Sequence, residues 1–121
     1  MTGVVAKEHF LGENKNKRLN CAQAVAMAFK DTLPFITDDT IKQFKKKGFG
    51  KAPEGECGMY FAAKYILEKT DHHHKIDDFT RYFLSFAPSV SCKELKKMKV
   101  PFCAECLKKS VDYVDDVIFP N

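Results

Sequence analysis

The sequence predicts an all-α fold, a compact single-domain bundle of five to seven helices that covers residues 1–121. Apolar residues recur at spacings of three and four in one segment after another, which is the helical period, and no stretch shows the alternation of a strand. A length of 121 residues suits one cysteine-rich helical domain with a modest core. Prolines mark the boundaries between the periodic segments, at Pro34, Pro53, Pro88 and Pro101.

Three helices are expected in the first half of the chain. The first covers about Thr2–Leu11, and the second covers about Asn20–Leu33 with Asn20 as a favourable N-cap. The third begins near Thr37 and stops at Gly48, because three lysines followed by glycine are typical of a helix end.

The second half predicts four more helices. The segment Cys57–Lys69 is apolar around most of its circumference, so it should be the central helix. Another helix covers about Asp77–Phe86, with Phe79, Tyr82, Phe83 and Phe86 in register. We expect Tyr60 and Tyr82 to be core residues with a polar tip. A short helix follows Ser91, because the pattern Ser-x-x-Glu forms a capping box that makes Cys92 the first helical residue. The last helix covers about Cys103–Phe119.

The composition indicates a globular protein of a reducing compartment. Apolar residues make up 45% of the chain and charged residues 30%, and no apolar stretch approaches the length of a membrane span. Lys7, Glu8 and His9 stand where a signal peptide needs its apolar stretch, so we expect a cytoplasmic protein. The five cysteines are an odd number, which argues against a closed disulfide framework.

The net charge of +4 is concentrated in three lysine-rich runs, at 15–18, 45–47 and 93–99. No nucleic-acid-binding motif accompanies these runs, so we expect solvated surfaces and no nucleic acid partner. The runs could instead dock an acidic electron-transfer partner protein. The oligomeric state is not predictable from these features.

Four of the five cysteines are predicted within the first turn of a helix. Asn20 precedes Cys21, a glycine-rich loop precedes Cys57, Ser91 precedes Cys92, and Pro101 stands two residues before Cys103. The unpaired N–H groups and the positive end of the helix dipole favour an anion at this position. A thiolate is such an anion, and it is both the nucleophile and the metal ligand. These four cysteines are therefore candidate cofactor and metal ligands, provided that the fold brings the helix ends together.

The fifth cysteine forms a Cys-x-x-Cys pattern on the last helix. Cys103 and Cys106 stand three residues apart and so face the same way, which makes them a candidate catalytic redox pair with Cys103 as nucleophile. The alternative is that Cys106 packs in the core beside Leu107. The three histidines His72, His73 and His74 most simply form a solvated turn, and a metal role for any of them stays open.

The segments "NCAQAV", "GECG", "SCKEL" and "CAECLKKSVDYVDDVI" resemble, in this order, the GCAxxG four-cysteine family of proteins inferred to be redox-active. The likeness extends from about Phe10 to Ile118. Met59 and Ala62 stand where the family signature has alanine and glycine, and Cys106 is an addition to the four-cysteine pattern. A similar domain occurs in split-Soret cytochromes, with a non-haem iron–sulfur centre. The resemblance implies an all-α domain whose ligands or redox thiols are Cys21, Cys57, Cys92 and Cys103.

Four functions remain open at this point, and the sequence does not decide whether the protein is an enzyme. The first is electron transfer through an iron–sulfur cluster held by the four thiolates. The second is thiol–disulfide chemistry without any cofactor. The third is a structural zinc site that ties the helices together. The fourth is a non-catalytic interaction module with inert, buried cysteines. No Ser-His-Asp arrangement and no carboxylate pair indicates a hydrolase.

Overall fold

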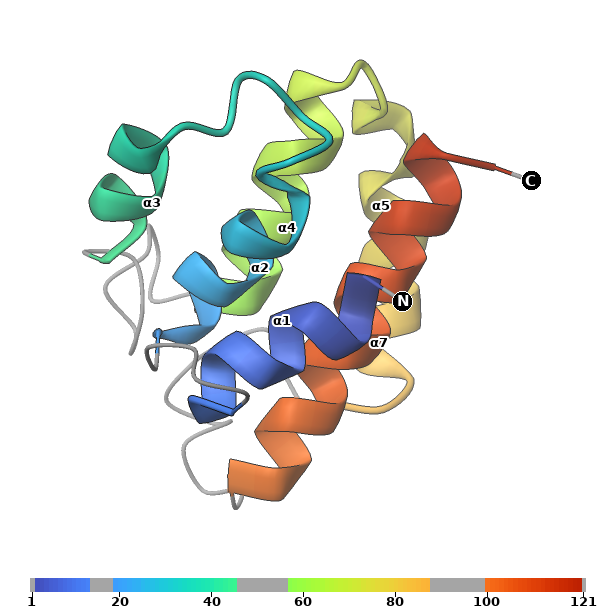
Figure 1. The fold of residues 1–121 in the computed structure, drawn as a ribbon. Coiled ribbons are helices and arrows are strands. Elements are labelled where there is room, and N and C mark those ends of the chain that lie inside the picture. The colour runs from blue at the N-terminus through green and yellow to red at the C-terminus, as the bar shows by residue number, and fades with distance from the viewer. Residues whose placement is uncertain (1, 14–18, 46–56, 88–99, 121) are drawn as a thin grey trace.

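The computed structural model describes residues 2–13, 19–45, 57–87 and 100–120, and the side chains of residues 100–103 lie outside the description (Figure 1). The described part is all-α, with six α-helices, one short 3₁₀ helix and no strand, which confirms the predicted fold class. The helices are α1 (Thr2–Leu11), α2 (Cys21–Phe29), α3 (Asp38–Phe44), α4 (Gly58–Lys69), α5 (Ile76–Leu84) and α7 (Val100–Ile118), and the 3₁₀ helix η3 is His73–Lys75.

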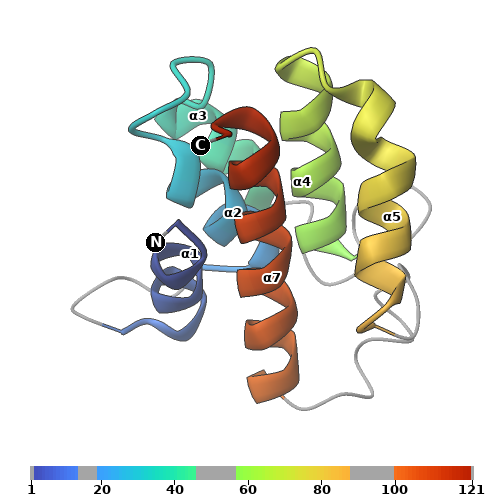
Figure 2. The same cartoon turned by 90° about the vertical axis from the view of Figure 1, so that its right-hand side faces the viewer.

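The long helix α7 packs against four other helices, α1, α2, α4 and α5 (Figure 2). Helix α4 lies between α2 and α5, and seven of its twelve residues are buried, as expected for the central helix. The core is rich in phenylalanine. Its largest fully buried side chains include Phe29, Phe79, Phe83, Ile66 and Leu67.

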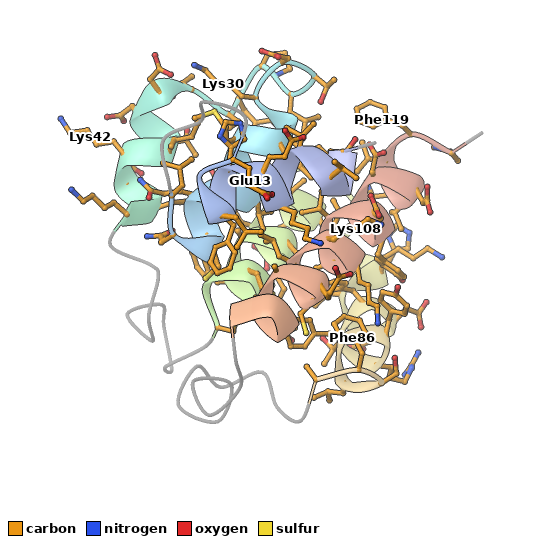
Figure 3. The ribbon with its side chains drawn as sticks, turned by 60° about the horizontal axis from the view of Figure 1, so that its bottom comes forward. Glu13, Lys30, Lys42, Phe86, Lys108 and Phe119 are labelled. Atoms are coloured by element: carbon orange, nitrogen blue, oxygen red, sulfur yellow. The ribbon has the colours of Figure 1, made fainter. Side chains whose placement is uncertain are left out.

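Helices α1 and α7 approach closely because residue 3 is glycine. The backbone N–H of Gly3 donates a 2.9 Å hydrogen bond to Asp112 Oδ1, so a carboxylate of α7 satisfies an unpaired donor at the start of α1. Lys108, which lies on α7 beside α1 (Figure 3), pairs with the same carboxylate at 3.1 Å. Nearer the other end of α1, Lys7 forms an ion pair with Glu105 of α7 at 2.6 Å.

Helices α1 and α4 both end in a left-handed residue. Gly12 has φ 71° and Glu13 N–H donates to the Glu8 carbonyl at 2.8 Å, which closes α1. At the end of α4 the same position is Asp71, with φ 61°, and His72 N–H donates to the Leu67 carbonyl at 2.7 Å. Both are Schellman-type endings, in which the left-handed residue lets the chain reverse onto the last carbonyls.

Two helices are shorter than predicted. Helix α2 ends at Phe29 rather than Leu33, and the chain continues as a turn in which Leu33 N–H donates to the Phe29 carbonyl at 2.9 Å. Pro34 disfavours helical geometry at Leu33, so the last predicted turn unwinds. Helix α5 ends at Leu84 rather than Phe86, because the chain tightens into a turn with Ser85 N–H bound to the Tyr82 carbonyl at 3.0 Å.

Helix α7 begins earlier than predicted, at Val100. Proline lacks the N–H that is unpaired in the first turn anyway, so Pro101 lies inside the helix start rather than before it. Cys103 is consequently the fourth residue of α7 and not its first. The predicted end of the third helix at Gly48 and the predicted helix after Ser91 both fall outside the described residues.

The two tyrosines expected in the core differ in their burial. Tyr60 is buried with a satisfied hydroxyl, 2.7 Å from Thr80 Oγ1, whereas Tyr82, which we expected in the core, is 37% exposed. Tyr82 stacks on Tyr113 at the surface, with ring centroids 5.1 Å apart. In the part of the chain that the structure describes, no helix combines the length and the apolar character needed to cross a membrane.

Candidate functional site

Two helices of the bundle begin at a cysteine and run side by side in the same direction. Cys21 is the first residue of α2, and Cys57 is the N-cap of α4. The two helices contact each other and start at the same end of the molecule (Figure 1). This parallel packing brings the two sulfurs into hydrogen-bonding contact, although the residues are far apart in the sequence. Both remain thiols.

The environment of Cys21 favours the thiolate. The Cys57 thiol donates a hydrogen bond to the Cys21 sulfur, and this bond is the main reason why the pKa of Cys21 falls from 9.0 to about 7. Burial opposes the shift, and the backbone N–H groups of Met59, Ala22 and Gly58 assist it. These donors come from the first turns of both helices, where N–H groups lack partners within the helix. Of the two thiols, Cys21 is therefore the one that ionises more readily.

The environment of Cys57 favours the protonated thiol. Its pKa is raised well above the ordinary value of 9.0, first by the hydrogen bond that it donates to Cys21, then by burial and by the negative charge of Cys21. The N–H groups of Tyr60 and Met59 partly oppose this effect. Exposure follows the same division, because Cys21 is half-buried whereas Cys57 is only 4% exposed.

The start of α2 is held by a reciprocal capping box. Gln23 N–H donates to Asn20 Oδ1 at 2.8 Å, and Asn20 N–H donates to Gln23 Oε1 at 3.2 Å. Both side chains also donate to carbonyls of a third helix. Asn20 Nδ2 bonds the carbonyls of Phe44 and Lys45 at 3.3 and 3.1 Å, and Gln23 Nε2 bonds that of Ile41 at 3.2 Å.

Asn20 is predicted as a helix cap from the sequence, whereas Gln23 and the contacts of both residues with α3 were not predicted. The sequence does contain a signal for the role of Gln23, because a capping residue followed three positions later by glutamine is the capping-box pattern. No local pattern indicates that the same amides reach α3, since that contact depends on how the helices pack.

The other predicted site residues are only partly described. Cys92 lies outside the described residues, and of Cys103 only its place on α7 is described. Cys106 is buried in the core beside Leu107, and its carbonyl accepts a 2.8 Å hydrogen bond from Ser110 Oγ. The proposed pairing of Cys103 with Cys106 therefore stays a prediction, as does convergence of all four predicted ligands.

Among the residues with described side chains, no three His, Cys, Asp or Glu side chains gather as metal ligands. Of the four predicted ligands, only Cys21 and Cys57 have side chains that the structure describes. The chemistry of these two fits a thiolate-bound metal, because adjacent sulfurs receive backbone N–H groups that offset negative charge. The three histidines lie on or next to η3, with His73 and His74 exposed, as expected for a solvated turn.

Comparison with known proteins adds no further assignment: no family model matches this chain, and neither a curated protein nor a solved structure matches it.

Proposed function

We propose that this protein is a small redox-active protein that performs thiol–disulfide chemistry with Cys21 and Cys57. The observation that carries this proposal is the hydrogen bond between the two thiols at the adjoining starts of α2 and α4. It couples a half-buried thiol of low pKa to a buried thiol of raised pKa. This division of labour suits an attacking and a resolving cysteine.

The reaction would oxidise the dithiol and reduce a disulfide. The Cys21 thiolate attacks one sulfur of the substrate disulfide, the substrate S–S bond breaks, and the first substrate thiolate leaves and takes up a proton. Cys57 then loses its proton and attacks the Cys21 sulfur, which releases the second substrate thiol. The two electrons come from Cys21 and Cys57, which end as a disulfide.

The raised pKa of Cys57 does not block the second step. The two effects of Cys21 on Cys57, the shared hydrogen bond and the negative charge, both depend on the Cys21 thiolate. Once Cys21 is joined to the substrate, its sulfur carries no charge, so the pKa of Cys57 falls. The N–H groups of Tyr60 and Met59 remain to stabilise the Cys57 thiolate.

A trapping experiment tests this proposal. The Cys57→Ser protein, incubated with oxidised glutathione, should accumulate a mixed disulfide at Cys21, because the resolving thiol is missing. The Cys21→Ser protein should accumulate far less. In Cys106→Ala the Cys21–Cys57 disulfide should form as in the unmodified protein. Mixed disulfide at Cys103 in place of Cys21, with loss of turnover in Cys106→Ala, would support the Cys103–Cys106 pair instead.

A metal centre is the second candidate, and the proximity of two of the four predicted ligands favours it. Together with Cys92 and Cys103, these thiolates would hold an iron–sulfur cluster for electron transfer, or a structural zinc ion. The resemblance to the GCAxxG four-cysteine family supports the iron–sulfur form. Protein purified without oxygen should then be brown and contain iron, and Cys21→Ser should lose both. Colourless protein without iron or zinc would contradict this candidate.

The lysines beside the site support an acidic partner protein. The proposed compartment is a reducing one such as the cytoplasm, which suits free thiols. Lys42 and Lys45 are exposed at the end of α3 that contacts Asn20, and Lys42 points away from the molecule (Figure 3). A partner that approaches Cys21 from this side meets positive charge, which accelerates encounter with an acidic surface. Reduction by such a partner should slow with added salt and in Lys42→Glu.

A further inference from the structure

The end of α3 is fastened to the start of α2 by side chains on either side of Cys21. Asn20 donates to the Phe44 and Lys45 carbonyls, and Gln23 donates to the Ile41 carbonyl. These carbonyls belong to the last turn of α3, where carbonyl groups lack partners within the helix. The two side-chain amides therefore bind the free carbonyls at the end of α3 and at the same time cap the start of α2.

The same end of α3 is also fastened to α4. The ring of Phe44 packs edge-on against Phe61 and Tyr65 of α4, with centroid distances of 5.6 and 5.1 Å. Phe44 itself is only 4% exposed. The three helices thus form a closed triangle: the amides join α2 to α3, the rings join α3 to α4, and the thiols join α4 to α2.

We propose that Asn20 and Gln23 are positioning residues for the Cys21–Cys57 pair, because they fix the first turn of α2 against α3 and thereby against the first turn of α4. This inference rests on the proposed function and adds the groups that hold its two sulfurs in register.

The position of α2 relative to α4 matters because the donors to Cys21 come from both helices. The N–H group of Ala22 belongs to α2, whereas those of Gly58 and Met59 belong to α4. The Cys57 thiol also comes from this side, because Cys57 is the N-cap of α4. Burial raises the pKa of Cys21, and these hydrogen bonds lower it. A small displacement of α2 would lengthen all the bonds that come from α4.

Asparagine suits position 20 because its amide has both an acceptor and donors. Serine at this position keeps the cap on Gln23 N–H but has no amide group to reach the Phe44 and Lys45 carbonyls. Asn20→Ser therefore separates the positioning role from simple helix capping. Gln23→Met is a second variant that removes the bond to Ile41 from the other side of Cys21.

The test measures the pH dependence of Cys21 alkylation by iodoacetamide, followed on the peptide that contains Cys21. In Asn20→Ser and in Gln23→Met, the rate at pH 6.5 should fall about two- to fivefold, the range expected when part of the stabilisation of an anion at a helix start is lost. The Cys21–Cys57 disulfide should also form at a more reducing glutathione ratio, since the reduced state loses stabilisation.

Gln43→Ala is the matched control, because Gln43 is an exposed amide of α3 whose side chain bonds only Asp39 among the contacts described. It should leave both readouts unchanged. The positioning role is overturned if folded Asn20→Ser keeps both the pH dependence of Cys21 alkylation and the glutathione ratio at which the disulfide forms. If Asn20→Ser does not fold, the same result in Gln23→Met overturns it. If instead the unmodified protein shows neither a low Cys21 pKa nor the disulfide, it is the proposed function that fails.

Discussion

The Cys57 thiol donates a hydrogen bond to the Cys21 sulfur, and this single contact moves the two pKa values in opposite directions. The acceptor gains stability as a thiolate, and the donor must keep its proton to make the bond. Above pH 7 the pair therefore carries predominantly one proton and one negative charge. The thiolate lies on the less buried residue, Cys21.

Removing the donor should raise the pKa of Cys21. In Cys57→Ala the hydrogen bond that contributes most to the low pKa is absent, while burial still opposes ionisation. We expect alkylation of Cys21 at pH 7 to slow by about fivefold, because a rise of one unit from a pKa of about 7 lowers the thiolate fraction from about one half to about one tenth. Mass spectrometry of the alkylated peptide measures this rate. An unaltered rate in Cys57→Ala would show that the helix-start N–H groups alone set the pKa of Cys21.

Stability should rise with pH across the range in which Cys21 ionises. Its pKa is about 7 when folded and 9.0 ordinarily, so between these values the unfolded chain binds a proton that the folded chain has released. The free energy of unfolding then increases from pH 7 to pH 9. Above pH 9 the contribution of Cys57 has the opposite sign, because its raised pKa keeps the proton in the folded state.

Urea titrations from pH 6 to pH 9 on the unmodified protein and on Cys21→Ser check this dependence. The increase between pH 7 and pH 9 should be much smaller in Cys21→Ser. An equal increase in both proteins would assign the pH dependence to other groups.

Gly3 should not tolerate a larger residue. A Cβ at this position would lie 2.7 Å from the Lys108 carbonyl oxygen and would also contact Asp112 Oδ1. Backbone of α7 cannot move aside easily, so Gly3→Ala should lower the free energy of unfolding by about 1–3 kcal/mol. Val4→Ala, at an exposed position of the same helix, should change it by less than about 1 kcal/mol. Equal stability of Gly3→Ala and the unmodified protein in urea would contradict the close packing of α1 on α7.

Asp71 should be replaceable by glycine with a gain in stability. It holds the left-handed position after α4 at φ 61°, where glycine has no steric penalty. We expect Asp71→Gly to raise the free energy of unfolding by about 0.5–1 kcal/mol, and Asp71→Ala not to raise it. Thermal unfolding of the three proteins gives the comparison, and a lower stability of Asp71→Gly would argue against this helix ending.

Much of the fold could be predicted because helical periodicity and caps are local signals. Thr2–Leu11 was predicted with the bounds of α1, and the apolar character of Cys57–Lys69 correctly indicated the central helix. The errors lie at helix ends. Leu33 could continue α2 by its pattern, but the following proline outweighs that pattern, and Pro101 proved to be part of a helix start rather than a boundary.

The candidate site could be predicted only in part. The preference of Cys21 and Cys57 for helix starts is visible in the sequence, but their contact depends on α2 and α4 packing in parallel, which no short pattern reports. The same reason explains why the reach of Asn20 to the Lys45 carbonyl was missed. Tyr82 shows the converse error, since its helical register placed it with Phe79 and Phe83, yet its ring lies at the surface.

If Cys21 and Cys57 exchange two electrons as a pair, equilibration in glutathione redox buffers followed by peptide mapping should detect the exchange. One cross-linked peptide that joins Cys21 to Cys57 is expected, formed reversibly as the buffer becomes more oxidising and absent from Cys21→Ser. Disulfides that join other cysteines while Cys21 and Cys57 stay reduced would contradict this pairing.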